Sequence, residues 1–92
     1  MIEVQVRNGM TTGDVFAEVE QEDGWPEHVV LMARGKQTAK MVWIATRLIE
    51  EADYMLDKTN ISLGTYSFEG SEGDEVVLSE MRIALVRDHV ED

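Results

Sequence analysis

Apolar and polar residues follow two distinct patterns in the first third of the chain. Residues 2–7 alternate between apolar and polar, which is the period of a strand with one buried face. The turn-forming residues Asn8 and Gly9 then interrupt the alternation. Residues 28–33 form a nearly continuous apolar run bounded by Gly35, a pattern typical of a buried strand. The sequence therefore predicts two strands, at 2–7 and at 28–33.

A short helix is predicted between these strands. Thr11 or Thr12 can cap its first turn, and Asp14 follows where a negative charge is favourable near the positive end of a helix. The helix has a narrow apolar stripe, formed by Val15, Phe16 and Val19. We expect it to end in the segment 23–26, because Pro26 cannot continue a helix.

The clearest helical pattern begins at Gln37 and continues to about Met55, with no Gly or Pro inside. At about 100° per residue, one side of this helix collects apolar residues: Met41, Val42, Ala45, Leu48, Ile49 and Ala52. The opposite side collects basic and aromatic residues: Lys36, Lys40, Trp43, Arg47 and Tyr54. We predict an amphipathic helix that packs its apolar side on a sheet.

The rest of the chain has the pattern of a β-hairpin. A turn is predicted around Asn60, followed by strands at 61–68 and 75–87. Between them, the segment 69–74 is acidic and glycine-containing, which is typical of a flexible hairpin loop. The predicted order β-α-β-α-β-β indicates one α/β (α+β) domain over residues 1–92. Its expected architecture is a two-layer sandwich, in which a mixed four-stranded sheet carries two helices on one face.

The distribution of charge isolates one basic segment in an acidic chain. The 92 residues include 19 acidic and 8 basic ones, for a formal net charge of −11. Residues 34–49 nevertheless contain four basic residues and no acidic residue. The acidity of the whole chain disfavours nonspecific attraction to nucleic acid or to an anionic membrane. Any surface that binds anions is therefore expected at this segment.

Several function classes are excluded or disfavoured by the residues present. The absence of cysteine excludes disulfides and thiolate metal sites. His28 and His89 are far apart and no serine or threonine has a recognised nucleophile context, so we expect no enzyme, no catalytic residue and no cofactor. The acidic loop lacks the alternating ligands of a calcium site, so we expect no metal. No signal peptide or membrane-spanning segment is recognisable, and a cytoplasmic location is expected.

The densest motif is VLMARGKQTAKMV at residues 30–42, an apolar strand followed by Ala-Arg-Gly, a basic residue and a lysine one turn into the helix. Together with the order of elements over residues 2–87, this motif resembles the Alba family, as an acidic and divergent member. Alba proteins are small nucleic-acid-binding proteins of archaeal chromatin, related to protein subunits of eukaryotic ribonuclease P. The resemblance implies a protein that binds RNA or DNA and forms a homodimer or a heterodimer with a paralogue.

The resemblance places candidate contacts at the turn between strand and helix. Family members bind nucleic acid through this turn, which implies phosphate contacts from Arg34, Gly35, Lys36 and Lys40. Elementary electrostatics agrees, because a helix N-terminus presents free N–H groups and a positive dipole end to an anion.

Trp43 and Arg47 are candidate nucleic-acid contacts that each have a second interpretation. Trp43 can stack on an unpaired base, a contact worth roughly 1–3 kcal/mol, although we favour a dimer or packing contact. Arg47 can extend the basic surface or pair with Glu50 or Glu51 at helical spacing.

Two departures from the family pattern leave a second function open. The loop at 8–12 lacks the paired basic residues usual in Alba proteins, and the hairpin at 69–75 is acidic where the family's arm is basic. Each neutralised phosphate adds about 0.9 to the salt slope on duplex DNA, so three or four contacts predict weak binding and favour RNA over chromatin packaging. The alternative is an Alba-fold interaction module that has lost nucleic-acid binding and meets a basic protein through its acidic surface.

Overall fold

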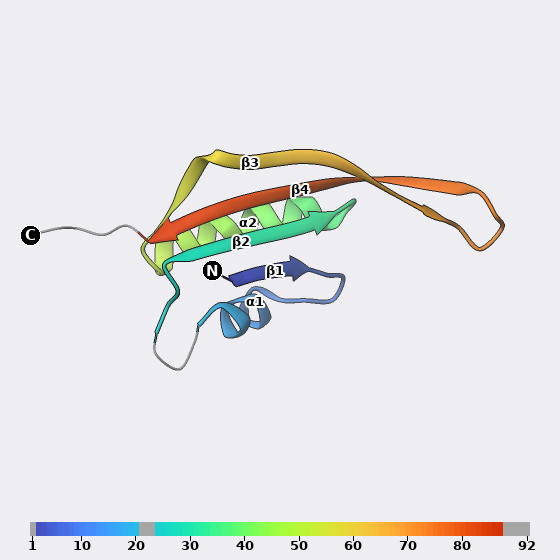
Figure 1. Cartoon of the computed structure of the whole chain (residues 1–92). Coiled ribbons are helices and arrows are strands. Elements are labelled where there is room, and N and C mark those ends of the chain that lie inside the picture. The colour runs from blue at the N-terminus through green and yellow to red at the C-terminus, as the bar shows by residue number, and fades with distance from the viewer. Residues whose placement is uncertain (1, 21–23, 88–92) are drawn as a thin grey trace, which may run out of the picture.

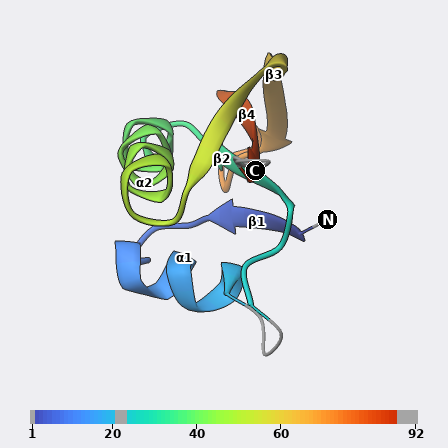
Figure 2. The same ribbon diagram turned by 90° about the vertical axis from the view of Figure 1, so that its left-hand side faces the viewer.

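Four strands and two helices form two layers in the computed structural model, which describes residues 2–20 and 24–87 (Figures 1 and 2). The strands are β1 (Ile2–Val6), β2 (His28–Arg34), β3 (Tyr54–Glu69) and β4 (Glu75–Arg87), and the helices are α1 (Thr12–Val19) and α2 (Gln37–Glu51). The sheet order is β1-β2-β4-β3, in which β1 and β2 are parallel and the other neighbours antiparallel. Both helices cover the same face of the sheet (Figure 2), so the predicted α+β class and element order are confirmed. His89 lies outside the described residues.

The predicted cap of α1 is confirmed at Thr11. Its hydroxyl accepts a hydrogen bond from the Asp14 N–H at 3.1 Å, and the Asp14 carboxylate accepts one from the Thr11 N–H at 2.9 Å. This reciprocal capping box satisfies two N–H groups that the start of a helix otherwise leaves unpaired. The helix ends at Val19 and Glu20 is already extended, so α1 stops earlier than Pro26 requires.

The end of α2 differs from the prediction. The helix stops at Glu51, and Asp53 adopts the left-handed backbone conformation with a φ of 58°. Aspartate enters this conformation more readily than most residues, so the chain leaves the helix without a glycine. Tyr54 therefore lies in β3, where it is buried, and the prediction that it joins the polar side of the helix is wrong.

The buried side of α2 is rotated relative to the predicted one. The residues that α2 buries are Met41, Ile44, Ala45 and Leu48. Val42 and Ile49, which were expected in the core, are 43% and 39% exposed. A helical wheel weighs every apolar residue equally, whereas the sheet covers only the arc centred near Leu48. The two residues at the margin of that arc consequently remain outside.

The sheet has one buried face and one open face. Val29, Leu31 and Ala33 of β2 point toward the helices and are fully buried. On the opposite face, Val30 is half-buried and His28 is exposed. The prediction of a buried strand is therefore confirmed on the side that faces the helices, and its other side is more open because both helices pack on the same face.

The hairpin of β3 and β4 is longer than predicted, and its far half extends beyond the helices as an arm (Figure 1). Asn60, where a turn was expected, lies within β3. The turn signal corresponds instead to a break in the strand register between Leu56 and Ile61. At the tip of the arm, the Gly70 N–H donates to the Asp74 carbonyl at 2.7 Å and closes the predicted loop.

An aromatic cluster joins β3 to the segment before β2. The Tyr54 hydroxyl donates a hydrogen bond to the Pro26 carbonyl. The Tyr54 ring meets Trp25 edge-to-face at 6.3 Å between centroids, and Trp25 meets Phe16 in the same way at 5.8 Å. Burial raises the pKa of Tyr54, so its hydroxyl remains a hydrogen-bond donor at neutral pH. This cluster fixes the start of β3 beside α1 and the segment before β2.

Candidate nucleic-acid interface

Four of the six predicted contacts lie at the basic turn, by which we mean residues 34–40, where β2 ends and α2 begins. Gly35 has a φ of 56°, a conformation that favours glycine, and its N–H donates to the Ser79 carbonyl at 2.7 Å. This bond ties the basic turn to β4 at the point where the arm begins. The Thr38 N–H donates to the Gly35 carbonyl at 3.2 Å, which completes the entry into the helix.

The N-terminus of α2 is suited to an anion. Lys36 occupies the N-cap position in a helical conformation and makes no capping hydrogen bond through its side chain. The first turn of α2 contains no acidic residue. The free N–H groups of this turn and the positive end of the helix dipole therefore face no protein carboxylate from the helix itself.

Lys36 and Lys40 are the two cations of the basic turn without an acidic partner. Lys36 is exposed and Lys40 is partly buried. Within residues 2–20 and 24–87, no carboxylate lies within ion-pair distance of either ammonium group. Both lysines can therefore approach a phosphate without first breaking an ion pair.

Arg34, in contrast, is held by an acidic side chain on β4. Its Nε lies 2.9 Å from Glu80 Oε2, and Glu80 Oε1 lies 3.6 Å from Nε of Arg82. Arg82 continues the network to Glu3, with 2.9 Å between Nη1 and Oε1. The hydrogen bond from Arg34 lowers the pKa of Glu80, so the carboxylate stays charged and offsets the charge of Arg34.

Trp43 and Arg47 interact with each other on the exposed side of α2. The Arg47 guanidinium lies 5.8 Å from the centre of the Trp43 ring, in cation–π geometry. Arg47 also forms an ion pair with Glu51, which confirms one of the two expected pairings. Trp43 itself is 56% exposed, an unusual degree for a residue of this type.

The helix places these side chains on one flank. Lys36, Lys40, Trp43 and Arg47 fall within about 60° of the helix surface, since each residue advances about 100°. Arg34 lies apart from them, on the open face of the sheet, because its partner Glu80 is its neighbour in the β2–β4 register. The structure therefore groups four of the six predicted contacts on one flank of α2 and places Arg34 on an adjoining surface.

Two further arginines at this site were not predicted from the sequence. Val6 pairs with Ala33 in the parallel register, so Arg7 and Arg34 both follow at the same end of the sheet. Arg7 makes a long ion pair of 3.8 Å with Glu18 and is well exposed. Arg82 follows from the β4 register. The signal that identifies both is strand pairing, which a single sequence does not specify.

The arm carries a strong negative charge. Its tip has four exposed acidic residues and no basic residue: Glu69, Glu72, Asp74 and Glu75.

In the part of the chain that the structure describes, no group of three or more potential ligands is arranged to hold a metal ion. The described helices are also too short and too polar to cross a membrane.

Comparison with known proteins identifies the fold. The sequence matches no protein-family model and no curated protein. The structure, however, is similar to that of Alba from Thermoplasma volcanium, with a TM-score of 0.76. The two chains share 26% sequence identity, and the similarity covers 92% of this chain and 99% of that one. The chain therefore has an Alba-like fold, as its sequence motif predicts.

Proposed function

We propose that this chain is a nucleic-acid-binding protein, not an enzyme, and that it contacts phosphates through the basic turn. Lys36 and Lys40 are the principal contacts, supported by a helix start that no side chain caps and by Gly35, whose positive φ forms the turn that leads into α2. The observation that carries the proposal is the pair of lysines without acidic partners beside an uncapped helix N-terminus. The Alba-like fold supports the same surface.

The charge at the basic turn favours RNA over the packaging of duplex DNA. Lys36 and Lys40 can act at once, whereas Arg34 must first exchange its bond to Glu80 for one to a phosphate. Two contacts predict a salt slope of about 1.4 on a single strand, since each contributes about 0.7. Chromatin packaging requires tighter binding than this small surface provides. Trp43 and Arg47 extend the surface where an unpaired base can stack.

Exposed apolar residues support a dimer. Large apolar side chains remain exposed on α2 and on β3, which lie in contact: Val42, Ile49, Ile61 and Leu63. Apolar side chains gathered on a small domain are typical of an interaction surface. We propose that a second copy or a paralogue covers them. Such a dimer doubles the number of phosphate contacts, because each chain contributes its own basic turn.

The proposal is tested by fluorescence anisotropy with labelled single-stranded RNA, duplex RNA and duplex DNA, over a series of salt concentrations. We expect saturable binding that weakens as salt increases. Lys36→Glu and Lys40→Glu should each lower the affinity strongly, because each reverses a charge at the site. Lys58→Glu on β3 is the matched control, since it makes the same change of charge away from the basic turn.

The same experiment separates the proposal from its alternative. If the folded protein binds none of the three nucleic acids at low salt, the chain is better explained as an interaction module that presents its acidic arm to a basic protein. If binding occurs but the changes at Lys36 and Lys40 have no more effect than Lys58→Glu, the basic turn is not the site.

A further inference from the structure

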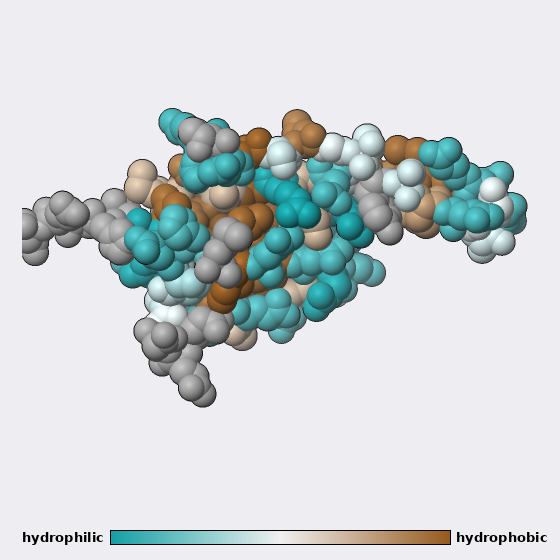
Figure 3. Space-filling model, viewed as in Figure 1, coloured by the Kyte–Doolittle hydropathy of each residue, from teal (hydrophilic) through white to brown (hydrophobic). Residues whose placement is uncertain are grey.

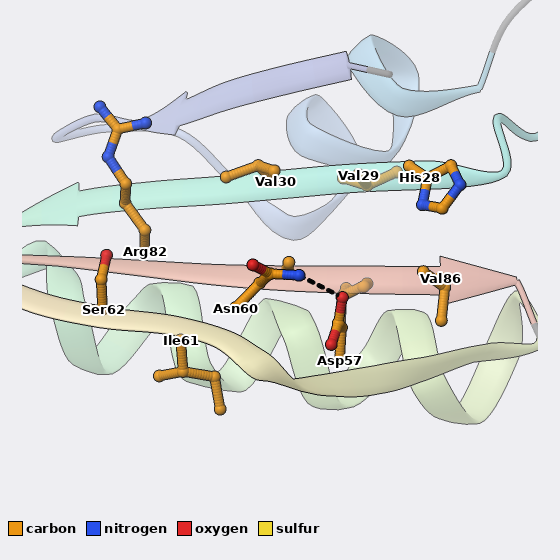
Figure 4. Close-up of a pocket in the computed structure, with 11 residues that line it drawn as sticks. His28, Val29, Val30, Asp57, Asn60, Ile61, Ser62, Arg82 and Val86 are labelled. Carbon is orange, nitrogen blue, oxygen red and sulfur yellow. Dashed lines mark hydrogen bonds between the residues drawn. The ribbon is translucent and has the colours of Figure 1, made fainter.

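A groove lies on the open face of the sheet, away from the basic turn. It has a volume of about 440 Å³, and residues of β2, β3 and β4 line it. Its origin is the break in the register of β3, because Leu56 pairs with Leu85 and Ile61 with Ile83. Residues 57–60 of β3 thus lie opposite the single residue Ala84. The extra length lifts β3 away from β4 and opens the groove between them (Figure 4).

The groove has an apolar floor and a polar wall. Its floor consists of open-face residues of β2 and β4: Val30, Ala84 and Val86. Its wall comes from β3, where the Asn60 amide donates to the Asp57 carboxylate at 2.6 Å and Ser62 follows. Figure 4 shows Arg82 and His28 at opposite ends. Figure 3 shows apolar residues exposed between polar ones on this same face of the molecule.

The lining selects a neutral, flat ligand with polar edges. Small-molecule sites of this volume combine an apolar surface with a few groups that fix orientation. A free anion is disfavoured, because Asp57 is itself negative and Arg82 is already paired with Glu3 and Glu80. A hydrocarbon chain is disfavoured, because it would strip water from the polar wall without replacing its hydrogen bonds. A nucleobase satisfies both conditions, since asparagine and carboxylate groups recognise base edges.

We propose that this groove receives an unpaired nucleobase of the strand whose phosphates lie on the basic turn. This inference rests on the proposed function and specifies single-stranded nucleic acid as its ligand. Strand β4 connects the two sites. At one end, Ser79 bonds the basic turn and Glu80 pairs with Arg34. Further along the strand, Arg82 lies at one end of the groove and Ala84 in its floor. Ser79 and Ala84 are about 17 Å apart at about 3.4 Å per residue, so a short strand segment spans them.

The test fills the groove without touching the basic turn. Ala84→Phe places a ring on the floor, where the side chain points to the open face and not into the core. Its matched control is Ala17→Phe, at an exposed position of α1. Asn60→Ala is a second variant that removes a polar group from the wall and adds no bulk. Thermal unfolding of each variant establishes that it is folded.

Three ligands are titrated: a single-stranded RNA, an oligonucleotide of the same length with abasic sites, and a nucleoside monophosphate. We expect the RNA to bind about tenfold more weakly to Ala84→Phe than to Ala17→Phe, as for the loss of one base contact. Asn60→Ala should weaken RNA binding in the same direction. Binding of the abasic strand should be equal in the two phenylalanine variants, because its phosphates still reach the basic turn. Backbone amide NMR shifts on adding the monophosphate should cluster at residues 57–62 and 82–86.

The outcomes distinguish the groove from the proposed function. If RNA binds equally to Ala84→Phe and Ala17→Phe but is lost in Lys36→Glu, the groove is not a base site and the basic turn remains the contact. If no strand binds but the monophosphate shifts the groove amides, the groove takes a free nucleotide, and the strand-binding function is wrong. If no ligand shifts these amides, the groove carries no such site.

Discussion

Glu80→Gln is expected to strengthen nucleic-acid binding, although it lies outside the predicted contact residues. In the structure, Glu80 bonds Arg34 at 2.9 Å and approaches Arg82 at 3.6 Å. The amide of glutamine keeps the size of the side chain and removes its charge. A phosphate then no longer competes with the Glu80 carboxylate for Arg34. The net charge of the network that contains Arg34, Arg82 and Glu3 also rises by one.

The magnitude follows from counterion release. One additional contact raises the salt slope on single-stranded RNA by about 0.7, from about 1.4 for two lysines to about 2.1 for two lysines and an arginine. At about 0.1 M salt, one decade below the 1 M reference, this increment corresponds to about a fivefold gain in affinity. The gain should shrink as salt increases and vanish near 1 M.

Fluorescence anisotropy over a salt series measures both quantities for Glu80→Gln. Glu20→Gln provides the control, because it removes one negative charge at the exposed end of α1, away from the basic turn. If Glu80→Gln has the same salt slope and the same affinity for RNA as Glu20→Gln, the argument that Glu80 masks Arg34 is refuted. A gain of equal size in both would attribute the effect to net charge alone.

The same ion pair gives a dependence of stability on pH. The hydrogen bond from Arg34 lowers the pKa of Glu80 in the folded chain, so the unfolded chain binds a proton more readily. The stabilisation is therefore fully present above the usual glutamate pKa of about 4.3 and is lost as the pH falls through the lowered value. Urea unfolding at several pH values should show that Glu80→Gln reduces this acid-dependent loss and Glu20→Gln does not.

Three further substitutions, one of them with a control variant, test the packing. Ile44→Val should lower the free energy of unfolding by about 1 kcal/mol, because Ile44 is fully buried, whereas Ile49→Val on the exposed margin of the same helix should change it much less. Tyr54→Phe should cost about 1 kcal/mol in urea unfolding, because the Pro26 carbonyl loses its hydrogen bond, and an unchanged midpoint would contradict that bond. Thr38→Val should leave stability unchanged or raise it by about 1 kcal/mol, since the Thr38 hydroxyl is buried and has no hydrogen-bond partner among the described residues. A less stable valine variant would show that this hydroxyl is satisfied.

Local patterns in the sequence were sufficient where the structure depends on local physics. The capping residues Thr11 and Asp14 are three apart, alternation identifies β1, and a continuous apolar run identifies β2. The end of α2 was missed because Asp53 leaves the helix without Gly or Pro, the residues on which such predictions rest. Tyr54 was misplaced for the same reason.

The candidate site was predictable only in part, because its electrostatics depends on strand register. Lys36 and Lys40 are apparent from the sequence as basic residues at a helix start. The neutralisation of Arg34 is not, because Glu80 is 46 residues away and meets it only through the pairing of β2 with β4. The groove was also unpredictable, since the break in β3 has no marker beyond the turn signal at Asn60.

The acidic residues of the arm have a consequence for how neighbouring molecules meet. β3 is the outer strand of the sheet over 16 residues, so one edge of it offers unpaired backbone groups to another chain. Leu63 and Val77 leave the arm apolar enough to add to that tendency. The carboxylates at the tip repel the same carboxylates on a second arm and thereby oppose edge-to-edge pairing. Replacing these carboxylates by the corresponding amides removes this repulsion, and the arms should then associate into extended sheets.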